Sequence, residues 1–245
     1  MRASPEPAVV SSPATNAAER TPVALVELYT SEGCSSCPPA DENLTRIAYA
    51  ARSAGKRVIA LSFHVDYWNY IGWKDPFSDP RYSERQRTHA GRLGSGVYTP
   101  QMVVAGREQL LGSRNEQADA AIRRALSRPA SHVIRIQVRE APATIAFDVV
   151  GPAREAVVFV AVALGAREVS VKTGENAGRT LSHVNVVRSL ASDRLRVPAR
   201  GTLALEIPKG VDPGAAMVVG WVEDAQSGHV LGAVAKSGLL ASRSP

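Results

Sequence analysis

The sequence predicts an α/β domain followed by an all-β, sandwich-like domain, with the boundary near residue 130. One observation is the order strand, helix, strand near the start, which needs a crossover connection and favours a parallel strand pair. Another is the series of short β-prone segments after Pro129, separated by Gly, Pro and Asp turn residues, which is typical of antiparallel β domains. The composition agrees, because 44% hydrophobic and 21% charged residues in a chain of 245 suffice for a core.

Three parts follow from this division. Residues 1–21 are expected to be a disordered leader, because Met1–Arg20 is rich in Ala, Ser, Pro and Thr. This stretch has no continuous apolar run, so it is not an intact secretory signal. Residues 22–130 are expected to form the α/β domain and residues 131–245 the β-rich domain. No apolar run approaches the roughly 20 residues that cross a bilayer, so no transmembrane segment is predicted.

Each element of the α/β domain has a local reason. The apolar run Val23–Tyr29 predicts a buried strand, and a second run over 58–65 predicts its neighbour. Between them, apolar residues at helical spacing predict a helix over residues 40–53, which Gly55 ends. The further expected elements are a polar helix over 81–92, a strand that starts after Pro100, and a helix over 115–127.

The β-rich domain is predicted from short runs with strand character. The turn signals between them include Gly151-Pro152, Gly174, Gly201 and Ser227-Gly228. The predicted runs cover residues 132–140, 144–150, 156–164, 168–172, 184–190, 202–207, 217–223 and 229–235.

The only two cysteines, Cys34 and Cys37, stand on the turn between the first strand and the first helix. A structural disulfide framework would need more cysteines at wider spacing, so this pair is interpreted as chemical. Two intervening residues let the sulfurs reach bonding distance, and the helix N-terminus lowers the pKa of the first thiol. We therefore expect Cys34 to be the exposed nucleophile and Cys37 the buried resolving thiol. A CxxC inside a strand–helix–strand pattern indicates a thioredoxin-like redox domain.

Longer motifs resemble one family. Residues 26–41, VELYTSEGCSSCPPAD, closely resemble the start of the DUF1223 proteins, and the resemblance continues through FHVDYW at 63–68 and YTPQ at 98–101. It also covers GENAGR at 174–179 and NVVR at 185–188. The resemblance implies a thioredoxin-like fold, a β-rich C-terminal part and an exported protein, periplasmic or secreted. It implies no particular substrate.

Four further residues are candidates for supporting roles. Thr99-Pro100 precedes a strand where thioredoxin-like folds place a cis-proline facing the CxxC, so we predict a cis bond that leaves the Thr99 backbone free to pair with a peptide. Glu27 either serves as a buried acid that shuttles a proton to the second cysteine or pairs with an arginine. His64 is either a base or metal ligand beside the CxxC, or a histidine hydrogen-bonded under the aromatic loop 66–77.

The segment 174–179, followed by His183, is unusual for a β domain. It is either a partner-binding loop or a Gly/Asn hairpin. The net charge of +6 does not indicate nucleic-acid binding, because the arginines are scattered and no aromatic residues interleave with them. The five histidines show no tight metal-ligand spacing, so no metal site is predicted from them.

The leading functional hypothesis is thiol–disulfide exchange on protein substrates, with an unidentified redox partner that resets the pair. No organic cofactor is expected, because the dithiol carries the electrons. Two alternatives remain. One is a copper or zinc module in which the two thiolates and His64 bind the metal. The other is a non-enzymatic interaction protein that works through its β domain.

Overall fold

The computed structural model describes residues 20–139, 144–205 and 216–237. Nearly all of the leader predicted over residues 1–21 lies outside this described part. So do the end of the run predicted over 202–207 and the last residue of the run predicted over 132–140.

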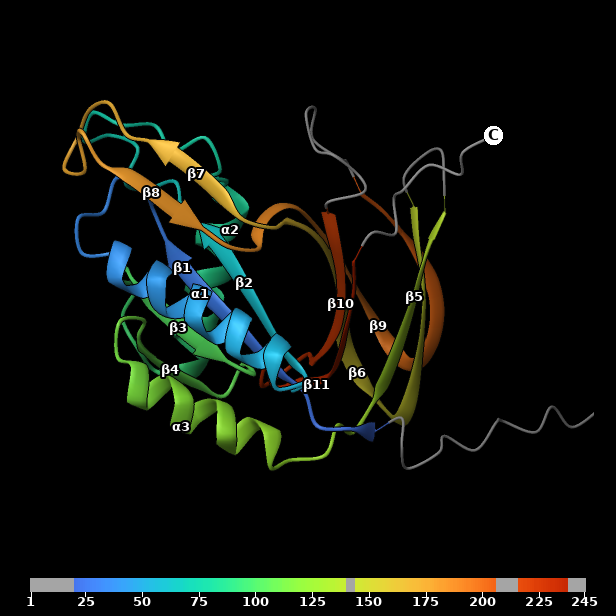
Figure 1. Cartoon of the computed structure of the whole chain (residues 1–245). Helices are drawn as coiled ribbons and strands as arrows, with labels where there is room; N and C mark the ends of the chain where they lie inside the picture. The colour runs from blue at the N-terminus through green and yellow to red at the C-terminus, as the bar shows by residue number, and fades with distance from the viewer. Residues whose placement is uncertain (1–19, 140–143, 206–215, 238–245) are drawn as a thin grey trace, which may run out of the picture.

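One continuous sheet runs through both halves of the chain, with the strand order β11-β10-β6-β9-β2-β1-β3-β4 and β5 paired with β6 (Figure 1). A separate two-stranded sheet contains β7 and β8. The fold is therefore mixed α/β with a large, mostly β sheet. The helices are α1 Pro38–Ser53, α2 Pro80–Leu93 and α3 Asn115–Leu126. The strands are β1 Ala24–Thr30, β2 Val58–His64, β3 Gln101–Val104, β4 Glu108–Leu111, β5 Val133–Arg139, β6 Thr144–Leu164, β7 Arg167–Ser170, β8 Thr180–His183, β9 Val186–Ala204, β10 Ala216–Asp224 and β11 Val230–Ser237.

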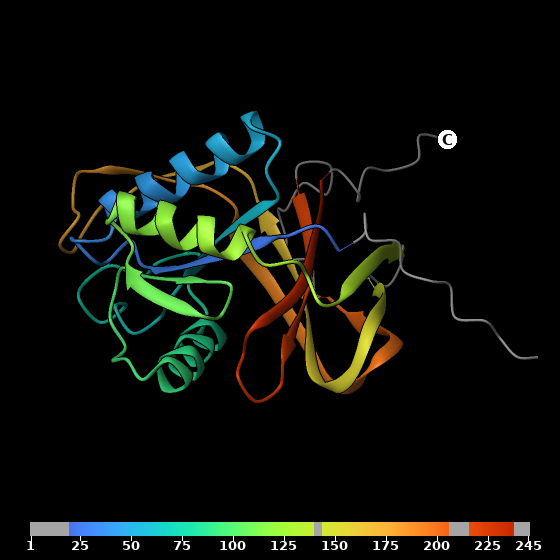
Figure 2. The ribbon, with the colours of Figure 1, turned by 90° about the horizontal axis from the view of Figure 1, so that it is seen from below.

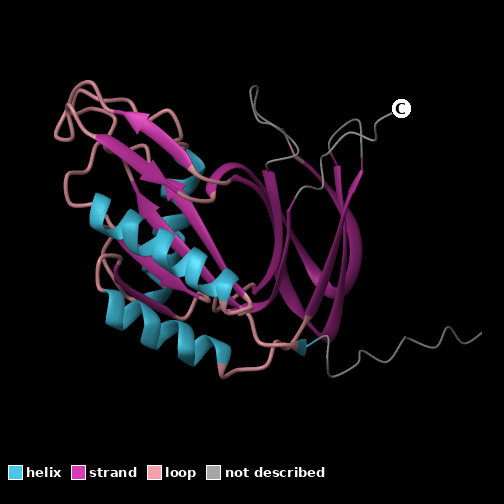
Figure 3. Ribbon diagram, viewed as in Figure 1, coloured by secondary structure: helices cyan, strands magenta, loops and turns pink. Residues whose placement is uncertain are grey.

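The first half of the sheet lies between helices. β1 pairs in parallel with β2 and antiparallel with β3, as the strand–helix–strand order predicts. Figure 2 shows α1 and α3 on one face of these strands and α2 on the other. All three helices lie in this half, whereas the described second half consists of strands and loops (Figure 3). Among the described residues, no helix has the length and apolar character to cross a membrane.

β1 is buried along its whole length, so the side chains on each of its two faces pack into a hydrophobic core. Val26 and Leu28 share a core with Leu44 of α1. Leu25 and Tyr29, which alternate with them, share a second core with residues of α2 and β10. Because side chains alternate along a strand, Glu27 lies on the face away from α1.

Helix α1 begins at Pro38, two residues earlier than predicted. The two prolines occupy its first turn, where their missing N–H groups have no helical partner to lose. Cys37 is the N-cap residue, so the cysteine pair leads directly into the helix.

The second half differs from the prediction in how its strands are divided. The runs over 144–150 and 156–164 belong to the single strand β6, and those over 184–190 and 202–207 fall largely in β9. Gly151-Pro152 does not end the strand; the β6–β9 pairing shifts register there, as Gly and Pro commonly do at bulges. Strands β4 and β8 had no separate prediction. The strands of the second half do not form two separate sheets. The long strands bend, which brings β5 close to β11. Just before β5, the His132 N–H donates to the Leu231 carbonyl at 3.0 Å.

The two halves meet at the edge of β2. The Ser62 N–H donates to the carbonyl of Asn185 at 3.0 Å, and the Asn185 side chain donates to the Ala60 carbonyl at 2.9 Å. Asn185 has a φ of 49°, a left-handed conformation that asparagine tolerates better than most residues. Strand β8, just before this junction, lies against α1 (Figure 1).

Candidate functional site

Cys34 and Cys37 form a disulfide, with their Sγ atoms 2.23 Å apart. The pair lies after the end of β1 and at the first turn of α1. The Cys37 carbonyl accepts hydrogen bonds from the N–H groups of Ala40 and Asp41, which begin the helix. The cysteine pair of the strand–turn–helix motif is therefore present as a disulfide.

The disulfide is buried, because Cys34 is 1% exposed and Cys37 is 0% exposed. The prediction that Cys34 is exposed at the tip of the turn is wrong for this oxidised protein. Ser35 and Ser36, between the cysteines, are the exposed residues of the turn. The sequence argument failed because it considered only the local turn and not the chain that packs over it.

The chain over the disulfide is the segment 174–179, which we call the cap loop. The Asn176 side-chain amide donates to the carbonyls of Glu32 and Cys34, at 2.8 Å and 3.0 Å. The Glu175 carboxylate accepts from the Ser35 N–H at 3.0 Å. Gly174 has a φ of 78°, and a Cβ there would lie 3.2 Å from Trp73 Cβ, so the position favours glycine on both counts. The cap loop thus binds the CxxC turn of its own chain.

Thr99 is the residue that contacts the disulfide from the other side. The Thr99-Pro100 bond is cis, as predicted. The Thr99 hydroxyl donates to Cys34 Sγ at 3.4 Å and accepts from the Trp68 indole N–H at 2.7 Å. The indole therefore fixes the hydroxyl with its proton directed at the sulfur.

Glu27 is not brought to the cysteines. Its carboxylate lies on the opposite face of β1, where it accepts from Arg85 Nε at 2.6 Å and from Arg85 Nη2 at 3.0 Å. Of the two alternatives for Glu27, the structure shows the pairing with an arginine. The second partner of Arg85 is Glu223 of β10, 2.5 Å from Nη2.

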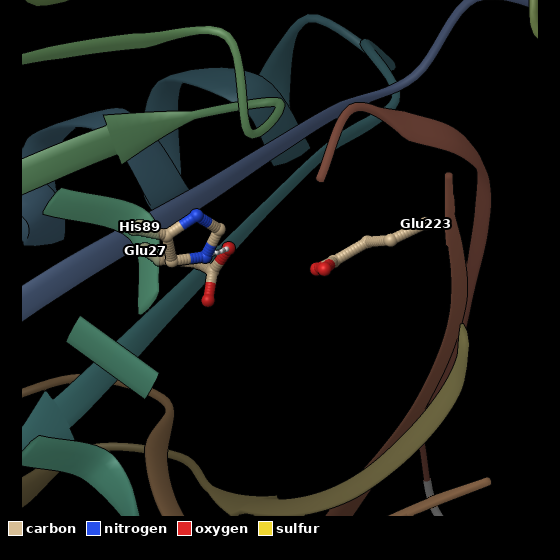
Figure 4. Close-up of side chains that lie close together, drawn as sticks. All are labelled: Glu27, His89 and Glu223. Atoms are coloured by element: carbon tan, nitrogen blue, oxygen red, sulfur yellow. Dashed lines mark ion pairs between the residues drawn. The ribbon is translucent and has the colours of Figure 1, made fainter. Parts of the chain in front are cut away.

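We call Glu27, Arg85, His89 and Glu223 the arginine cluster. Figure 4 shows Glu27 beside His89, with the carboxylate of Glu223 directed toward them from the curled part of the sheet. Burial raises the pKa of Glu27, but the charges of Arg85 and His89 outweigh it and hold the pKa well below its usual value. Arg85 also lies over the Phe159 ring at 4.4 Å, so one guanidinium joins the two halves of the fold.

His64 lies on the α1 face of β2 and is fully buried. Its Nδ1 is 2.7 Å from the Asp75 carboxylate, and its ring packs edge-on against Phe77. This is the predicted histidine under the aromatic loop. The ring also packs edge-on against His183, with centroids 4.7 Å apart.

Around these two rings lies a second buried group of ionisable residues, which we call the histidine cluster: Glu32, Asp41, His64, Asp75 and His183. His183 lies between two carboxylates, with Nε2 3.6 Å from Glu32 and Nδ1 3.6 Å from Asp41. Burial lowers the pKa of His183, but Asp41 and Glu32 outweigh it and raise the pKa to about 10. For Asp75, burial raises the pKa, but His64 and two backbone N–H groups outweigh burial and lower the pKa below its usual value.

The comparisons with known proteins now become informative. The model of the DUF1223 family, described as a protein of unknown function, matches residues 25–223. The chain belongs to the DUF1223 family. Its fold is similar to the crystal structure of a protein from Agrobacterium tumefaciens, with 28% identity, a TM-score of 0.66, and coverage of 91% of this chain and 97% of that one.

HBP35 of Porphyromonas gingivalis shares the fold of this DUF1223 chain at 16% identity, with a TM-score of 0.64 and coverage of 89% of this chain and 75% of that one. No curated protein matches the chain. The comparisons therefore establish the family and the fold, and leave the activity to the site.

In this DUF1223 protein, the structure brings together Cys34, Cys37 and Thr99 among the predicted site residues. No sequence pattern singles out Asp75 within the aromatic loop 66–77, or links it to Glu32, whose N–H donates to the Asp75 carboxylate at 2.9 Å. Asn176 and His183 stand in segments that the sequence marked as unusual. The contact of Asn176 with Cys34 joins residues more than 140 positions apart, and so does the pairing of His183 with Glu32.

Proposed function

We propose that this DUF1223 protein is a thiol–disulfide oxidoreductase for protein substrates, built on a thioredoxin-like first half. One observation carries the proposal: the Cys34–Cys37 disulfide lies at the N-terminus of α1 with the hydroxyl of Thr99, the residue before cis-Pro100, 3.4 Å from Cys34 Sγ. A helix N-terminus and a hydroxyl donor both stabilise a thiolate when the pair is reduced.

The proposed chemistry is two successive exchanges. The Cys34 thiolate attacks a substrate disulfide, a bond forms between Cys34 Sγ and one substrate sulfur, and the other substrate sulfur leaves as a thiolate. The Cys37 thiolate then attacks Cys34 Sγ, which restores the Cys34–Cys37 bond and releases the second substrate thiolate. Two electrons pass from the pair to the substrate. The reverse sequence oxidises a substrate dithiol, and a redox partner resets the pair in either direction.

Access to the sulfurs requires movement of the cap loop. Ser35 and Ser36 are exposed, so a partner first meets the turn between the cysteines. The hydrogen bonds from Asn176 to the carbonyls of Glu32 and Cys34 hold the cap loop on the CxxC turn, so these bonds break when the cap loop moves. We propose that the protein works in an exported, oxidising compartment, where a disulfide persists.

Substrate trapping tests this proposal. In the variant Cys37→Ser the resolving thiol is gone, so mixed disulfides at Cys34 are expected to accumulate as high-mass species that disappear on reduction. The matched control is Cys34→Ser, which retains one thiol but is expected to trap few partners. The experiment uses a periplasmic extract of a bacterium that carries the protein. Equal trapping by both variants, or none by either, would contradict the exchange mechanism.

A further inference from the structure

The histidine cluster contains an unusual number of buried polar atoms without a hydrogen-bond partner. These atoms are Glu32 Oε1, Asp41 Oδ1, His64 Nε2, and both ring nitrogens of His183. All of the residues are at most 4% exposed. Burying a polar atom without a partner is unfavourable, and the two pairs that four of these atoms form, Glu32 with His183 and Asp41 with His183, are 3.6 Å long, so a further group that satisfies the atoms is expected.

Three of these side chains, those of Glu32, Asp41 and His64, form hydrogen bonds through their other polar atom. Glu32 Oε2 accepts from the Trp73 indole at 2.7 Å, and Asp41 Oδ2 accepts from the Thr30 hydroxyl at 3.2 Å. The Nδ1 of His64 bonds to Asp75 at 2.7 Å, which leaves Nε2 as the free ring nitrogen.

A histidine whose Nδ1 bonds to a carboxylate while Nε2 stays free is the arrangement found in metal sites, where the carboxylate orients the ring. His183 repeats this arrangement more loosely, with Nδ1 toward Asp41 at 3.6 Å and Nε2 toward Glu32 Oε1 at 3.6 Å. Ligand atoms of Glu32, His64 and Asp75 lie within 4.8 Å of one another.

From this geometry we propose that the histidine cluster is a binding site for a divalent transition-metal ion, with Glu32 Oε1, His64 Nε2 and His183 Nε2 as its protein ligands. Asp75 and Asp41 orient the two imidazoles. The site is separate from the cysteines, so it does not rest on the proposed exchange chemistry.

The donor set defines the class of metal. Two imidazole nitrogens and one carboxylate oxygen suit Zn²⁺ and its transition-metal neighbours, whereas Mg²⁺ and Ca²⁺ prefer oxygen ligands. Bonds of about 2.0–2.2 Å to Zn²⁺ require the three ligand atoms to converge on a common point. Glu32 Oε1 and His183 Nε2 are already 3.6 Å apart, and the rings of His64 and His183 pack with centroids 4.7 Å apart, so the side chains must rotate to bring His64 Nε2 to the same point. Three carboxylates also surround the site, and a divalent cation offsets their charge.

The competing occupant is a proton on His183. In that case the imidazolium alone neutralises Glu32 and Asp41, and the cluster is a buried ion-pair network without a metal. The two states differ in one measurable property, which is the stoichiometric uptake of metal.

Calorimetric titration of chelator-treated protein with ZnCl₂ tests the proposal. The titration uses the oxidised wild-type protein and the double variant Cys34→Ser/Cys37→Ser, because neither has a thiolate that binds zinc. We expect one Zn²⁺ per chain in both, together with a rise in Tm on adding zinc. Titration with Co²⁺ should give a visible absorption spectrum without a sulfur charge-transfer band.

Single variants locate the site. His64→Gln and His183→Gln should abolish stoichiometric uptake, and Asp75→Asn should weaken it by about tenfold to hundredfold. The matched control is His89→Gln, because His89 is also a buried histidine, but its Nε2 pairs with Glu27 at 3.3 Å and the neighbouring carboxylates pair with Arg85. That variant should bind zinc as the wild-type does. Circular dichroism identifies any variant that has not folded.

The proposal is wrong if the oxidised wild-type protein takes up no Zn²⁺ or Co²⁺ at stoichiometric levels, a result that does not depend on the stability of any variant. It is also wrong if His89→Gln reduces binding as much as His64→Gln does. Neither result bears on substrate trapping by Cys37→Ser, so failure of the metal site and failure of the exchange chemistry are distinguishable.

Discussion

The arginine cluster and the histidine cluster lie on opposite faces of the same strands, and they balance buried charge in different ways. Each contains carboxylates and at least one histidine, all almost fully buried. In the arginine cluster a guanidinium reaches both carboxylates at 2.5–2.6 Å, so its cation is part of the protein. In the histidine cluster, the only ion pairs that the carboxylates form with described residues are with imidazoles, and the His183 pairs are 3.6 Å long.

We infer from this difference that the arginine cluster has a structural role and that the histidine cluster has a functional one. An arginine stays charged and cannot leave, so the arginine cluster has one state and joins β1, α2 and β10. An imidazole can exchange its proton or bind a metal ion, so the histidine cluster is the one for which we propose a bound ligand. Only the second cluster adjoins the CxxC turn, because Glu32 precedes Cys34 by two residues and Asp41 follows Cys37 by four.

The largest effect is expected from Arg85→Met. It removes the guanidinium that pairs with the buried carboxylates of Glu27 and Glu223, and breaking a buried ion pair typically destabilises a protein by about 3–5 kcal/mol. Urea denaturation measures the change in the free energy of unfolding. The control is Arg87→Met on the same helix, whose exposed pair with Glu84 contributes at most about 1 kcal/mol. Similar losses for both variants would show that the arginine cluster has no special structural weight.

A smaller effect is expected from Asn176→Ala, which removes both side-chain hydrogen bonds from the cap loop. We expect a loss of about 1–3 kcal/mol in stability and faster reduction of the disulfide by dithiothreitol, because the cap opens more often. The control is Glu168→Ala, at an exposed position of β7. An unchanged reduction rate for Asn176→Ala would mean that the cap loop does not limit access to the sulfurs.

The pH dependence of stability distinguishes a paired carboxylate from an unpaired one. The folded pKa of Glu27 is below its unfolded value of about 4.5, so the stability it contributes is present above that pH and is lost as the pH falls toward the folded pKa. Its slope is at most about 1.4 kcal/mol per pH unit. Denaturation between about pH 5 and pH 2 should show a shallower slope for Glu27→Gln than for the wild-type protein. Parallel slopes would contradict the pairing.

The smallest effect is expected from Thr99→Val, which keeps the shape of the side chain and removes the hydroxyl donor. Loss of one hydrogen bond to the Cys34 thiolate should slow alkylation of the reduced protein by about twofold to tenfold. Thr99→Ser retains the donor and should react as the wild-type protein does. If Thr99→Ser is as slow as Thr99→Val, packing of the methyl group rather than the hydrogen bond controls the rate.

The sequence predicted the features that depend on local order. The parallel β1–β2 pair, the buried β1 and the cis bond at Pro100 all follow from residues close together in the chain. It failed where distant segments meet. The division of the β runs was wrong because Gly151 and Pro152 were read as a turn, although the pairing of β6 with β9 continues across them through a register shift.

The site was predictable to the same extent. Cys34 and Cys37 were identified because their spacing is chemically meaningful by itself, and Thr99 was identified from the position at which thioredoxin-like folds place a cis-proline. The burial of Cys34 was missed, since Asn176 reaches it from 142 residues further along the chain. The histidine cluster was missed for the same reason, because no spacing in the sequence connects His64 with His183 before the fold brings them together.

The distance in sequence between the CxxC turn and its cap also has a consequence in time. At synthesis rates of 5–20 residues per second, the 142 residues that separate Cys34 from Asn176 take on the order of ten seconds to emerge. Until Asn176 has emerged, the cap loop cannot form its hydrogen bonds with the CxxC turn. The two cysteines of the nascent chain are therefore not covered by the cap loop during that interval.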